Sequence, residues 1–593
     1  MIIEKETQVA FESALDSLEP LWSAAYDEGV SRRVELPNAT LKSCILRTVE
    51  QQASEVHVVY KERELTFAEM NEYACRLANG LMASGLRKGD AVCVFLGDNP
   101  ELIITYMACY KAGFIAVGLN PRSTVDELAR RLRDSSARAI VVSSSVVCAA
   151  LAGLADSGAN AEIVISADDA AGTKVSSRGP QEVPSCDAVS SRCVRIIPWA
   201  HFLASASSNE PEVSLSPSDV AVMIYTGGTT GVPKGCPLTH QMLIWAQYFF
   251  YSFLAPRLGG ARSMTSLLTS PMTHAYGMDF GVNWGIVIGG KVVIAHSLDG
   301  PTILQLIRKQ QVTVWGAVPA MIDLFCEELE RLGGEVPSLA VAVVSCAAAS
   351  SGVLDRFCRL CEHVTLVQDY GMTETSGPVT LTPVVRGMNR GSVGVPVENT
   401  DILVVDLETG TVPVPQGECG EVIFRGPQII GEYWKVPGET AKAFRGEWLY
   451  SGDVGYFDEK GFLHVVDRIK DVIEVSGFSV FPREIDEVIH AHPQVVDTCT
   501  IGVPDDKSGE RPKSFVVRDA EGRLSEQDII DYCHEHLIAY KCPKYVEFVD
   551  RIPLTINGKP NKCELRRREE SKRKQQVAQL AHDALARTRM KKH

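Results

Sequence analysis

The apolar positions in the first quarter of the chain alternate between two spacings. From about Leu41 to Val142, short apolar runs that suit buried strands occur as VHVVY, AVCVFL, FIAVGL and AIVVS. Between them lie stretches with helical spacing, such as Phe67 to Ser84. Strand-like runs that alternate with helical stretches are typical of an α/β architecture. The pattern therefore predicts layered sheets and helices in this part of the chain.

The middle of the chain contains three regions of different pattern. Residues 155–218 are rich in Ser, Asp, Ala and Gly and have only short apolar runs, which predicts a variable surface segment with few strands. Alternating strands and helices resume over 220–367. Short β-rich runs, DILVVD, GEVIFRG and GFLHVVD, then dominate 394–466. We expect these runs to form a smaller β subdomain.

The pattern changes again at Lys470. Helical stretches at 484–492 and 526–537 flank the strand-like runs TCTIGV and SFVVRD, which predicts a compact α+β domain. The last residues are rich in Lys, Arg, Gln and Ala and predict a solvated helix. The expected organisation is an N-terminal domain at 1–469, a small mobile C-terminal lid at 470–565 and a basic helical tail at 566–593.

Composition and charge restrict the class of ligand. A chain of 593 residues is too long for one hydrophobic core, so two or more domains are expected. The formal net charge of -15 opposes broad attraction to nucleic acid or to an anionic bilayer. We therefore expect small molecules, and no nucleic acid, as partners. The sequence leaves a homodimer open.

Several features favour a cytoplasmic location. The N-terminal stretch carries acids where a secretory signal has a basic start and an apolar run. The most apolar windows are too short and too interrupted to span a bilayer. The 17 cysteines are interpreted as reduced thiols. Membrane contact is expected, at most, from the basic tail at the inner membrane face.

The strongest chemical signal is YTGGTTGVPKG, from Tyr225 to Gly235. Glycines let the backbone approach an anion, threonine hydroxyls donate hydrogen bonds and Lys234 supplies a positive charge. A triphosphate fits this chemistry. The stretch does not contain G-x-x-x-x-G-K-[ST], which disfavours a kinase or GTPase. The predicted nucleotide-binding residues are Thr226, Gly227, Gly228, Thr229, Thr230, Gly231 and Lys234.

A second motif, DYGMTETSG from Asp369 to Gly377, makes the chain resemble the adenylate-forming superfamily. This superfamily contains acyl-CoA synthetases, luciferases and peptide-synthetase adenylation domains, and the resemblance covers about Leu41 to Arg568. It implies that Tyr370 lies against adenine and that Glu374 holds Mg²⁺, since a carboxylate suits that hard cation. The segment SCAAAS resembles a small-residue lining of the adenine and acyl pockets. Nucleotide-binding residues implied by these two segments are Asp369, Tyr370, Gly371, Met372, Thr373, Ala347, Ala348 and Ala349.

Two later motifs extend the resemblance to the ribose and the hinge. YSGD implies that Asp453 accepts hydrogen bonds from both ribose hydroxyls, and DRIKD implies that Arg468 also reaches the ribose. Lys470 takes the position of the interdomain hinge. Val465 is assigned to the same nucleotide-binding set. Taken singly, each charged residue suits an ordinary surface ion pair, but their order and spacing favour a site.

The resemblance also implies the reacting centre. Lys559 in PLTINGKPN matches the lysine that contacts the acid carboxylate and the α-phosphate, where it stabilises the transition state electrostatically. His274 in PMTHAYG matches a position near the acyl carboxyl and the thiol channel. The assigned catalytic residues are Lys559, Glu374, Thr229 and His274, and the assigned metal ligands are Thr230 and Glu374.

The implied reaction has two halves. An acid and ATP·Mg²⁺ give an acyl-adenylate and pyrophosphate, after which the thiol of coenzyme A displaces AMP. The small domain turns between the halves and brings a second face, Ser476, Gly477 and Phe478, toward coenzyme A. Glu474 departs from the pattern, because several relatives carry a basic or apolar residue there. The contacts of the second half-reaction are therefore less closely defined by the resemblance.

The spelling of the phosphate loop and the C-terminal sequence look most like bacterial medium- to long-chain fatty acyl-CoA ligases. A ligase for aryl or alicyclic acids, and an adenylating enzyme that loads a freestanding acyl carrier protein, stay open as alternatives. A luciferase-like oxygenase would need light emission with an added luciferin. A non-catalytic relative would be expected to have lost Lys559 or Glu374, and both are present.

Overall fold

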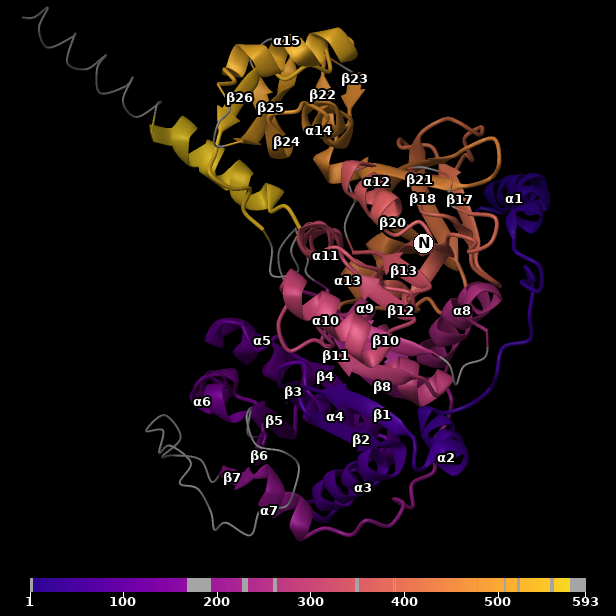
Figure 1. Ribbon diagram of the computed structural model, residues 1–593, viewed down its shortest axis with the longest axis vertical. Helices are drawn as coiled ribbons and strands as arrows, with labels where there is room; N and C mark the ends of the chain where they lie inside the picture. Colours follow the sequence, from indigo (N-terminus) through magenta and orange to yellow (C-terminus); the bar gives the residue numbers. More distant parts are fainter. Residues whose placement is uncertain are drawn as a thin grey trace, which may run out of the picture.

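The structure is a computed structural model that describes most of the chain. The described residues are 4–167, 194–226, 233–259, 264–346, 351–387, 389, 391–476, 478–505, 508–519, 523–554 and 559–575. Figure 1 shows a large domain of sheets and helices and a small domain at one end. The predicted mixed α/β class, with a large N-terminal and a small C-terminal domain, is confirmed.

Two large sheets form the body of the large domain. The first has seven strands, parallel except at β9, in the order β7 (Arg195–Pro198), β6 (Ile163–Ala167), β5 (Ala139–Ser143), β3 (Ala91–Phe95), β4 (Ile115–Gly118), β8 (Val220–Tyr225) and β9 (Gly235–Thr239). The second has nine, with a parallel centre, in the order β16 (Val395–Pro396), β15 (Pro378–Leu381), β14 (Thr365–Gly371), β13 (Val341–Val344), β12 (Val314–Ala317), β10 (Thr265–Leu268), β11 (Lys291–Ile294), β1 (Val56–Tyr60) and β2 (Arg63–Thr66).

Helices cover and separate these sheets. They are α2 (Leu41–Gln52), α3 (Phe67–Ala83), α4 (Pro100–Ala112), α5 (Val125–Ser135), α6 (Val147–Ser157), α7 (Trp199–Ala204), α8 (His240–Leu258), α9 (Ala275–Met278), the π-helix η4 (Asp279–Ile288), α10 (Gly300–Gln310), α11 (Pro319–Leu332) and α12 (Ser351–Leu360). Every residue of α4 is buried, because the helix is apolar on all sides. Its Lys111 is ion-paired with Glu210 at 2.6 Å.

The segment predicted as a surface excursion contributes to a sheet. Its described residues include β6 and β7, which extend the seven-stranded sheet at one edge. Residues 168–193 lie outside the described part. The few-strand prediction for 155–218 therefore misses a structural role, because β7 is a short half-buried strand with weak alternation.

A third, antiparallel sheet forms the β subdomain. It consists of β17 (Asp401–Val405), β18 (Gly420–Arg425), β20 (Trp448–Phe457), β19 (Phe444–Arg445) and β21 (Leu463–Arg468). The N-terminal helix α1 (Lys5–Ala25) lies beside it in Figure 1. The Trp22 indole donates to the Gly461 carbonyl at 3.1 Å, and Phe11 packs edge-on against Trp448. A helix at the start of the chain thus covers a sheet formed by strands within residues 401–468.

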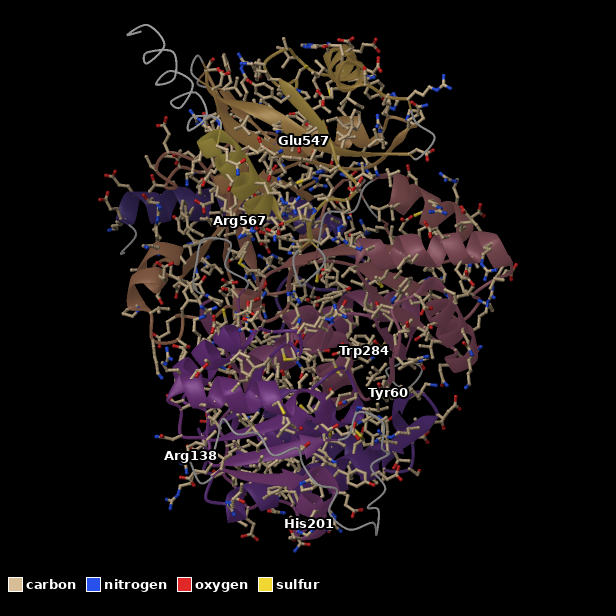
Figure 2. All side chains as sticks on the ribbon, turned by 90° about the vertical axis from the view of Figure 1, so that its left-hand side faces the viewer. Tyr60, Arg138, His201, Trp284, Glu547 and Arg567 are labelled. Atoms are coloured by element: carbon tan, nitrogen blue, oxygen red, sulfur yellow. The ribbon has the colours of Figure 1, made fainter. Side chains whose placement is uncertain are left out.

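The small domain has its own core. Its sheet contains β23 (Phe478–Val480), β22 (Ile473–Val475), β25 (Gly509–Arg518), β24 (Val495–Asp505) and β26 (Tyr545–Phe548), and its helices are α14 (Pro482–His490) and α15 (Glu526–His536). A last helix spans 562–575. Figure 2 shows Glu547 and Arg567 at this end of the molecule and Trp284 in the large domain.

The first part of the predicted basic tail is not free in solution. The Arg566 guanidinium pairs with Asp471 at 2.7 Å, and Lys572 pairs with Glu547 at 2.7 Å. These ion pairs hold the helix against the small domain. Residues 576–593 lie outside the described part. None of the helices in the described ranges combines the length and apolarity needed to cross a bilayer.

Candidate active site

Three of the predicted motifs meet at Asp453. The Tyr370 hydroxyl, at the end of β14, donates to Asp453 Oδ2 at 2.5 Å. Arg468, at the end of β21, pairs through Nε with Asp453 Oδ1 at 2.7 Å. Burial raises the pKa of Asp453, and the Arg468 charge opposes that rise. The structure therefore gathers the residues assigned to adenine and ribose around one buried carboxylate.

Glu374 and Lys234 are joined by Tyr433. The Tyr433 hydroxyl donates to Glu374 Oε1 at 2.7 Å, while Lys234 Nζ lies 4.3 Å from the centroid of the Tyr433 ring. Lys234 also faces Glu439 on α13 (Pro437–Ala443) at 3.7 Å. The sequence analysis did not identify Tyr433, because a single tyrosine in GEYWK carries no distinctive pattern. Its partner Glu374 is 59 residues away.

The base of the phosphate loop is closed by backbone contacts. Thr226 N–H donates to the Lys234 carbonyl at 2.9 Å, and Lys234 N–H donates to Thr226 Oγ1 at 3.4 Å. The Tyr225 hydroxyl donates to Asp134 on α5 at 2.6 Å, which fixes the strand that enters the loop. Several predicted site residues lie outside the described residues: Gly227, Gly228, Thr229, Thr230, Gly231, Ala347, Ala348, Ala349 and Gly477.

The turn that carries Glu374 is built from the rest of its motif. Met372 N–H donates to Thr375 Oγ1 at 3.0 Å and begins the short helix η5 (Thr373–Thr375). Gly371 needs to be glycine, since a Cβ there would lie 2.3 Å from the Gly377 carbonyl oxygen. Asp369 precedes this turn and is 9% exposed, and burial raises its pKa to about 7. The motif thus places the Glu374 carboxylate on the side of Lys234 and buries the carboxyl group of Asp369.

Lys559 approaches this cluster from the small domain. Its charge interacts with those of Asp453 and Arg468. Burial by the surrounding protein lowers the pKa of Lys559, although part of the residue faces solvent. The structure therefore brings the predicted catalytic lysine to the side of the predicted ribose residues.

His274 caps the short helix α9 beside the same centre. Its Nδ1 accepts from Tyr276 N–H at 3.4 Å, so the neutral ring carries its proton on Nε2. Burial and the charge of Lys559 lower the pKa of His274 to about 4. The imidazole is accordingly neutral near pH 7.

Comparison with known proteins identifies this arrangement. The profile of the family described as AMP-binding enzyme matches residues 45–434, and that of the AMP-binding enzyme C-terminal domain matches residues 484–559. The chain belongs to the AMP-binding enzyme family. The predicted adenylate-forming superfamily and the acid–thiol ligase class are thereby confirmed.

Individual relatives cover nearly the whole chain. A long-chain-fatty-acid–CoA ligase of Bacillus subtilis (strain 168) is 31% identical over 91% of this chain and 96% of its own. A feruloyl-CoA synthase of an Amycolatopsis species is 31% identical over 85% and 94%. The crystal structure of ATP-bound MatB from Rhodopseudomonas palustris superposes with a TM-score of 0.78 at 26% identity, and covers 90% of this chain and 99% of its own.

In this AMP-binding enzyme, several contacts cross from the β subdomain to the small domain. The Arg483 guanidinium, on α14, donates to the Val465 carbonyl at 2.6 Å, and Arg483 N–H donates to Asp467 at 3.0 Å. Lys562 lies 3.5 Å from the same Asp467 carboxylate. Lys470 lies between these contacts, exposed in the helical turn η6 (Ile469–Asp471). The predicted hinge is thus spanned by polar contacts on both sides.

The residues predicted to meet coenzyme A belong to the small domain. Ser476 N–H donates to the Ser508 carbonyl at 2.8 Å. Phe478 is 56% exposed and stacks on Tyr540 with 4.8 Å between ring centroids. The described contacts of both residues stay within the small domain. The structure therefore does not join them to the Asp453 cluster.

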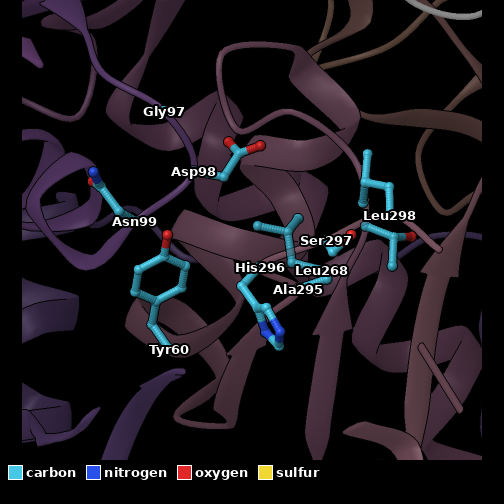
Figure 3. Close-up of a pocket in the computed structure, with 10 residues that line it drawn as sticks. Tyr60, Gly97, Asp98, Asn99, Leu268, Ala295, His296, Ser297 and Leu298 are labelled. Carbon is cyan, nitrogen blue, oxygen red and sulfur yellow. The ribbon is translucent and has the colours of Figure 1, made fainter. Parts of the chain in front are cut away.

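The large domain also contains a hollow of about 250 Å³, lined by residues at the ends of β1, β3, β10 and β11. Figure 3 shows Tyr60, Asp98, Leu268 and Ala295 among the residues that line it. Asp98 lines it and accepts from Met272 N–H at 2.8 Å. Burial raises the pKa of Asp98 to about 6. Through Asp98, the hollow borders the segment that leads to His274.

Proposed function

We propose that this AMP-binding enzyme joins a medium- or long-chain fatty acid to coenzyme A through an acyl-adenylate. The observation that carries the proposal is the meeting of Tyr370, Arg468 and Lys559 around Asp453, which provides for adenosine and for a reacting phosphate in one place. The name of the Bacillus subtilis relative supports a fatty acid. ATP and coenzyme A are the cofactors that the family uses.

In the first half-reaction, an oxygen of the acid carboxylate bonds to the α-phosphorus of ATP while the bond to pyrophosphate breaks. The Lys559 ammonium stabilises the charge that develops on the phosphate and carboxylate oxygens. Neutral His274 can donate from Nε2–H to the acid, because its Nδ1 is already occupied. Lys234 and the loop from Thr226 would receive the leaving phosphates.

Mg²⁺ fits the residues of this site. Glu374 engages one carboxylate oxygen with Tyr433, and a carboxylate can bind a hard cation through its second oxygen. Glu374 would hold the cation, with the predicted ligand Thr230 outside the described residues. The cation would neutralise phosphate charge. Tyr433 orients the Glu374 carboxylate for that role.

In the second half-reaction, the thiol of coenzyme A attacks the acyl carbon and AMP leaves. We propose that residues 470–565 then turn about Lys470, so that Lys559 withdraws and Ser476, Gly477 and Phe478 face the pantetheine arm. The exposure of Phe478 supports a surface with a further partner. The proposed limits are 1–469 for the large domain, 470–565 for the lid and 566–593 for the basic tail.

Two alternatives to a fatty acid–CoA ligase stay open. The name of the feruloyl-CoA synthase relative supports an aryl acid, and this relative is 31% identical to the chain, as is the fatty-acid ligase. The adenylation centre would equally serve an enzyme that loads a freestanding acyl carrier protein.

We propose a cytoplasmic location, with any membrane contact made by the tail at the inner face, and leave a homodimer as an open oligomeric state.

The test is acid-dependent release of AMP and pyrophosphate from ATP and coenzyme A. The acids are acetate, hexanoate, palmitate, benzoate and a dicarboxylate, with mass detection of thioesters. A fatty thioester is expected. An aryl thioester would replace the fatty-acid assignment, and AMP release without any thioester would direct the test to carrier proteins. Release of neither product with any acid would contradict the proposed function.

A further inference from the structure

The acyl part of the substrate has to extend away from Lys559 into the large domain. The charge of Lys559 affects His274 and Cys346, two residues of the large domain. His274 caps α9, which continues into η4, and Cys346 follows Ser345 directly after β13 and interacts with the buried Asp369. Under the proposed function, we therefore place the boundary of the acyl group at these residues.

Asp369 is an unusual lining residue for that boundary. Ser345 is the side-chain partner that lowers its raised pKa. The second carboxyl oxygen, Oδ1, is buried and has no hydrogen-bond partner among the described residues. Cys346, the neighbour of Ser345, interacts with both Asp369 and Lys559. Among the described residues, this buried acceptor therefore has no partner, and it lies next to residues that interact with Lys559.

A second buried carboxyl, that of Asp279, accompanies it. Asp279 is 1% exposed and accepts from Gln247 Nε2 at 3.0 Å. Its Oδ2 lies 3.5 Å from the position that a Cβ on Gly377 would occupy, so it contacts the back of the turn that follows Asp369. Burial and the charge of Asp369 raise the pKa of Asp279. The two carboxyls thus belong to one buried cluster.

Another polar atom of this cluster lacks a partner. Gln247 Oε1 is buried without a hydrogen bond among the described residues. Asp279 and Asn283 both lie on η4, and π-helices are rare and frequent at functional sites.

Burying this cluster of carboxyl groups beside a plain alkyl chain would cost free energy. A buried polar group without a hydrogen bond costs free energy, and a buried carboxyl is normally paired. Apolar residues would suit an alkyl group better. A hydroxyl or ammonium on the ligand would supply the donor that Asp369 Oδ1 lacks, and Asp279 would accept from the same group or support it.

We propose that Asp369, which the resemblance assigned to the nucleotide, instead forms with Asp279 a specificity subsite for acids whose acyl part carries a hydrogen-bond donor, either a hydroxyl or an amino group. The inference rests on the proposed function and narrows its substrate class. It is compatible with a medium-chain or an aryl acid, since the donor and not the carbon skeleton is specified.

The experiment compares matched acids in the pyrophosphate-release assay. One series is octanoate, ω-hydroxyoctanoate and ω-aminooctanoate, and the other is benzoate with its para-hydroxy and para-amino forms. We expect kcat/KM for one donor-bearing member to exceed that of its plain parent by at least about 100-fold, because a site built for a donor rejects the analogue that lacks it. Equal or higher kcat/KM for the plain parents in both series would overturn the inference and leave the proposed function standing.

Variants of Asp369 distinguish a hydroxyl donor from an amino donor on the acid. Asp369→Leu is expected to reduce the ratio of kcat/KM between the donor-bearing acid and its plain parent to below about 10-fold. Asp369→Asn, which keeps an acceptor but no charge, is expected to retain a hydroxyl preference and to lose an ammonium preference. Asp458→Asn, in the β subdomain, is the matched control and should leave the ratio unchanged. A ratio unaffected by Asp369→Leu would overturn the subsite. If Asp369→Leu does not fold, the wild-type ratio decides. A lack of activity with every acid tested would contradict the proposed function itself.

Discussion

Tyr433 links the two charged side chains that the proposed function assigns to ATP and Mg²⁺. Tyr433→Phe removes the hydrogen bond to Glu374 and keeps the ring beneath Lys234. A hydrogen bond to a charged group is worth roughly 1.5–3 kcal/mol, so we expect the concentration of Mg²⁺ needed for half-maximal pyrophosphate release to rise about 10-fold or more. Tyr450→Phe, whose hydroxyl donates to the Gly410 carbonyl, is the control. The same Mg²⁺ dependence in both variants would contradict this role.

Asp369 gives a pH-dependent prediction. Burial raises its pKa from 3.8 to about 7, so the native state holds this proton over a pH range in which the unfolded chain has released it. The free energy of unfolding therefore falls as pH rises between these values, and the full cost of the carboxylate is present above pH 7. Asp369→Asn removes that cost. We expect its stabilisation relative to wild type to be larger at pH 8 than at pH 5 by about 1–3 kcal/mol. Equal shifts of the thermal midpoint at both pH values would refute the assignment.

Single residues differ in how far the sequence could predict them. Asp453, Tyr370 and Arg468 stand in short motifs with a fixed order, and the structure joins them. Asp279 is one polar residue in the apolar run HAYGMDFGVNWGIVIGG, so the sequence alone gives it no partner. Its hydrogen bond to Gln247 depends on the packing of η4 against α8. Residue roles that depend on packing between elements were not predictable.

At the scale of elements, the hinge is held by contacts that have to break when the small domain turns. Asp467, on β21, meets Lys562 and the backbone N–H of Arg483. Asp467→Asn removes the charge and keeps an acceptor. The side chains of Asp467 and Lys562 are only 6% and 18% exposed, so their pair is worth more than the roughly 1 kcal/mol of a surface ion pair, and we expect the turned arrangement to gain at least about 5-fold in population. Thioester formation from supplied acyl-adenylate should become faster and adenylation slower.

Lys572→Gln is the matched control for this hinge prediction. Lys572 lies on the same C-terminal helix but pairs with Glu547 and Glu569, which do not cross the hinge. Both half-reactions should keep their wild-type rates in this variant. If Asp467→Asn changed both half-reactions in the same direction, the contact would support folding and not the choice between arrangements.

The periodic patterns predicted the helices and strands themselves better than they predicted which elements pack against each other. The apolar runs AVCVFL and AIVVS form the adjacent buried strands β3 and β5. In α1, Phe11, Leu15, Leu18 and Trp22 repeat with helical spacing and are buried. Nothing in that spacing indicates that the β subdomain covers this face. The π-helical winding of η4 was also hidden, because an apolar run fits several helical geometries.

For the whole molecule, composition and length predicted more than one domain, and the change of pattern at Lys470 predicted a separate small domain after it. The relative placement of the domains was not predictable. It depends on a few polar contacts between distant segments, such as Arg483 with the Val465 carbonyl, and such contacts leave no periodic signal. Lys559 reaches the Asp453 cluster only through that placement.

That placement gives the last prediction. Lys559→Ala should slow acyl-adenylate formation by about 100- to 1000-fold, the effect of losing one preorganised group at a transition state. Thioester formation from a supplied acyl-adenylate should change little, because the proposed turn withdraws Lys559 before the thiol attacks. Burst measurements of pyrophosphate and of thioester separate the two steps, and Lys572→Ala serves as the control for loss of a lysine in the small domain. An equal loss in both steps would mean that Lys559 stays at the reacting centre throughout, and the two halves would then have to share one arrangement of the domains.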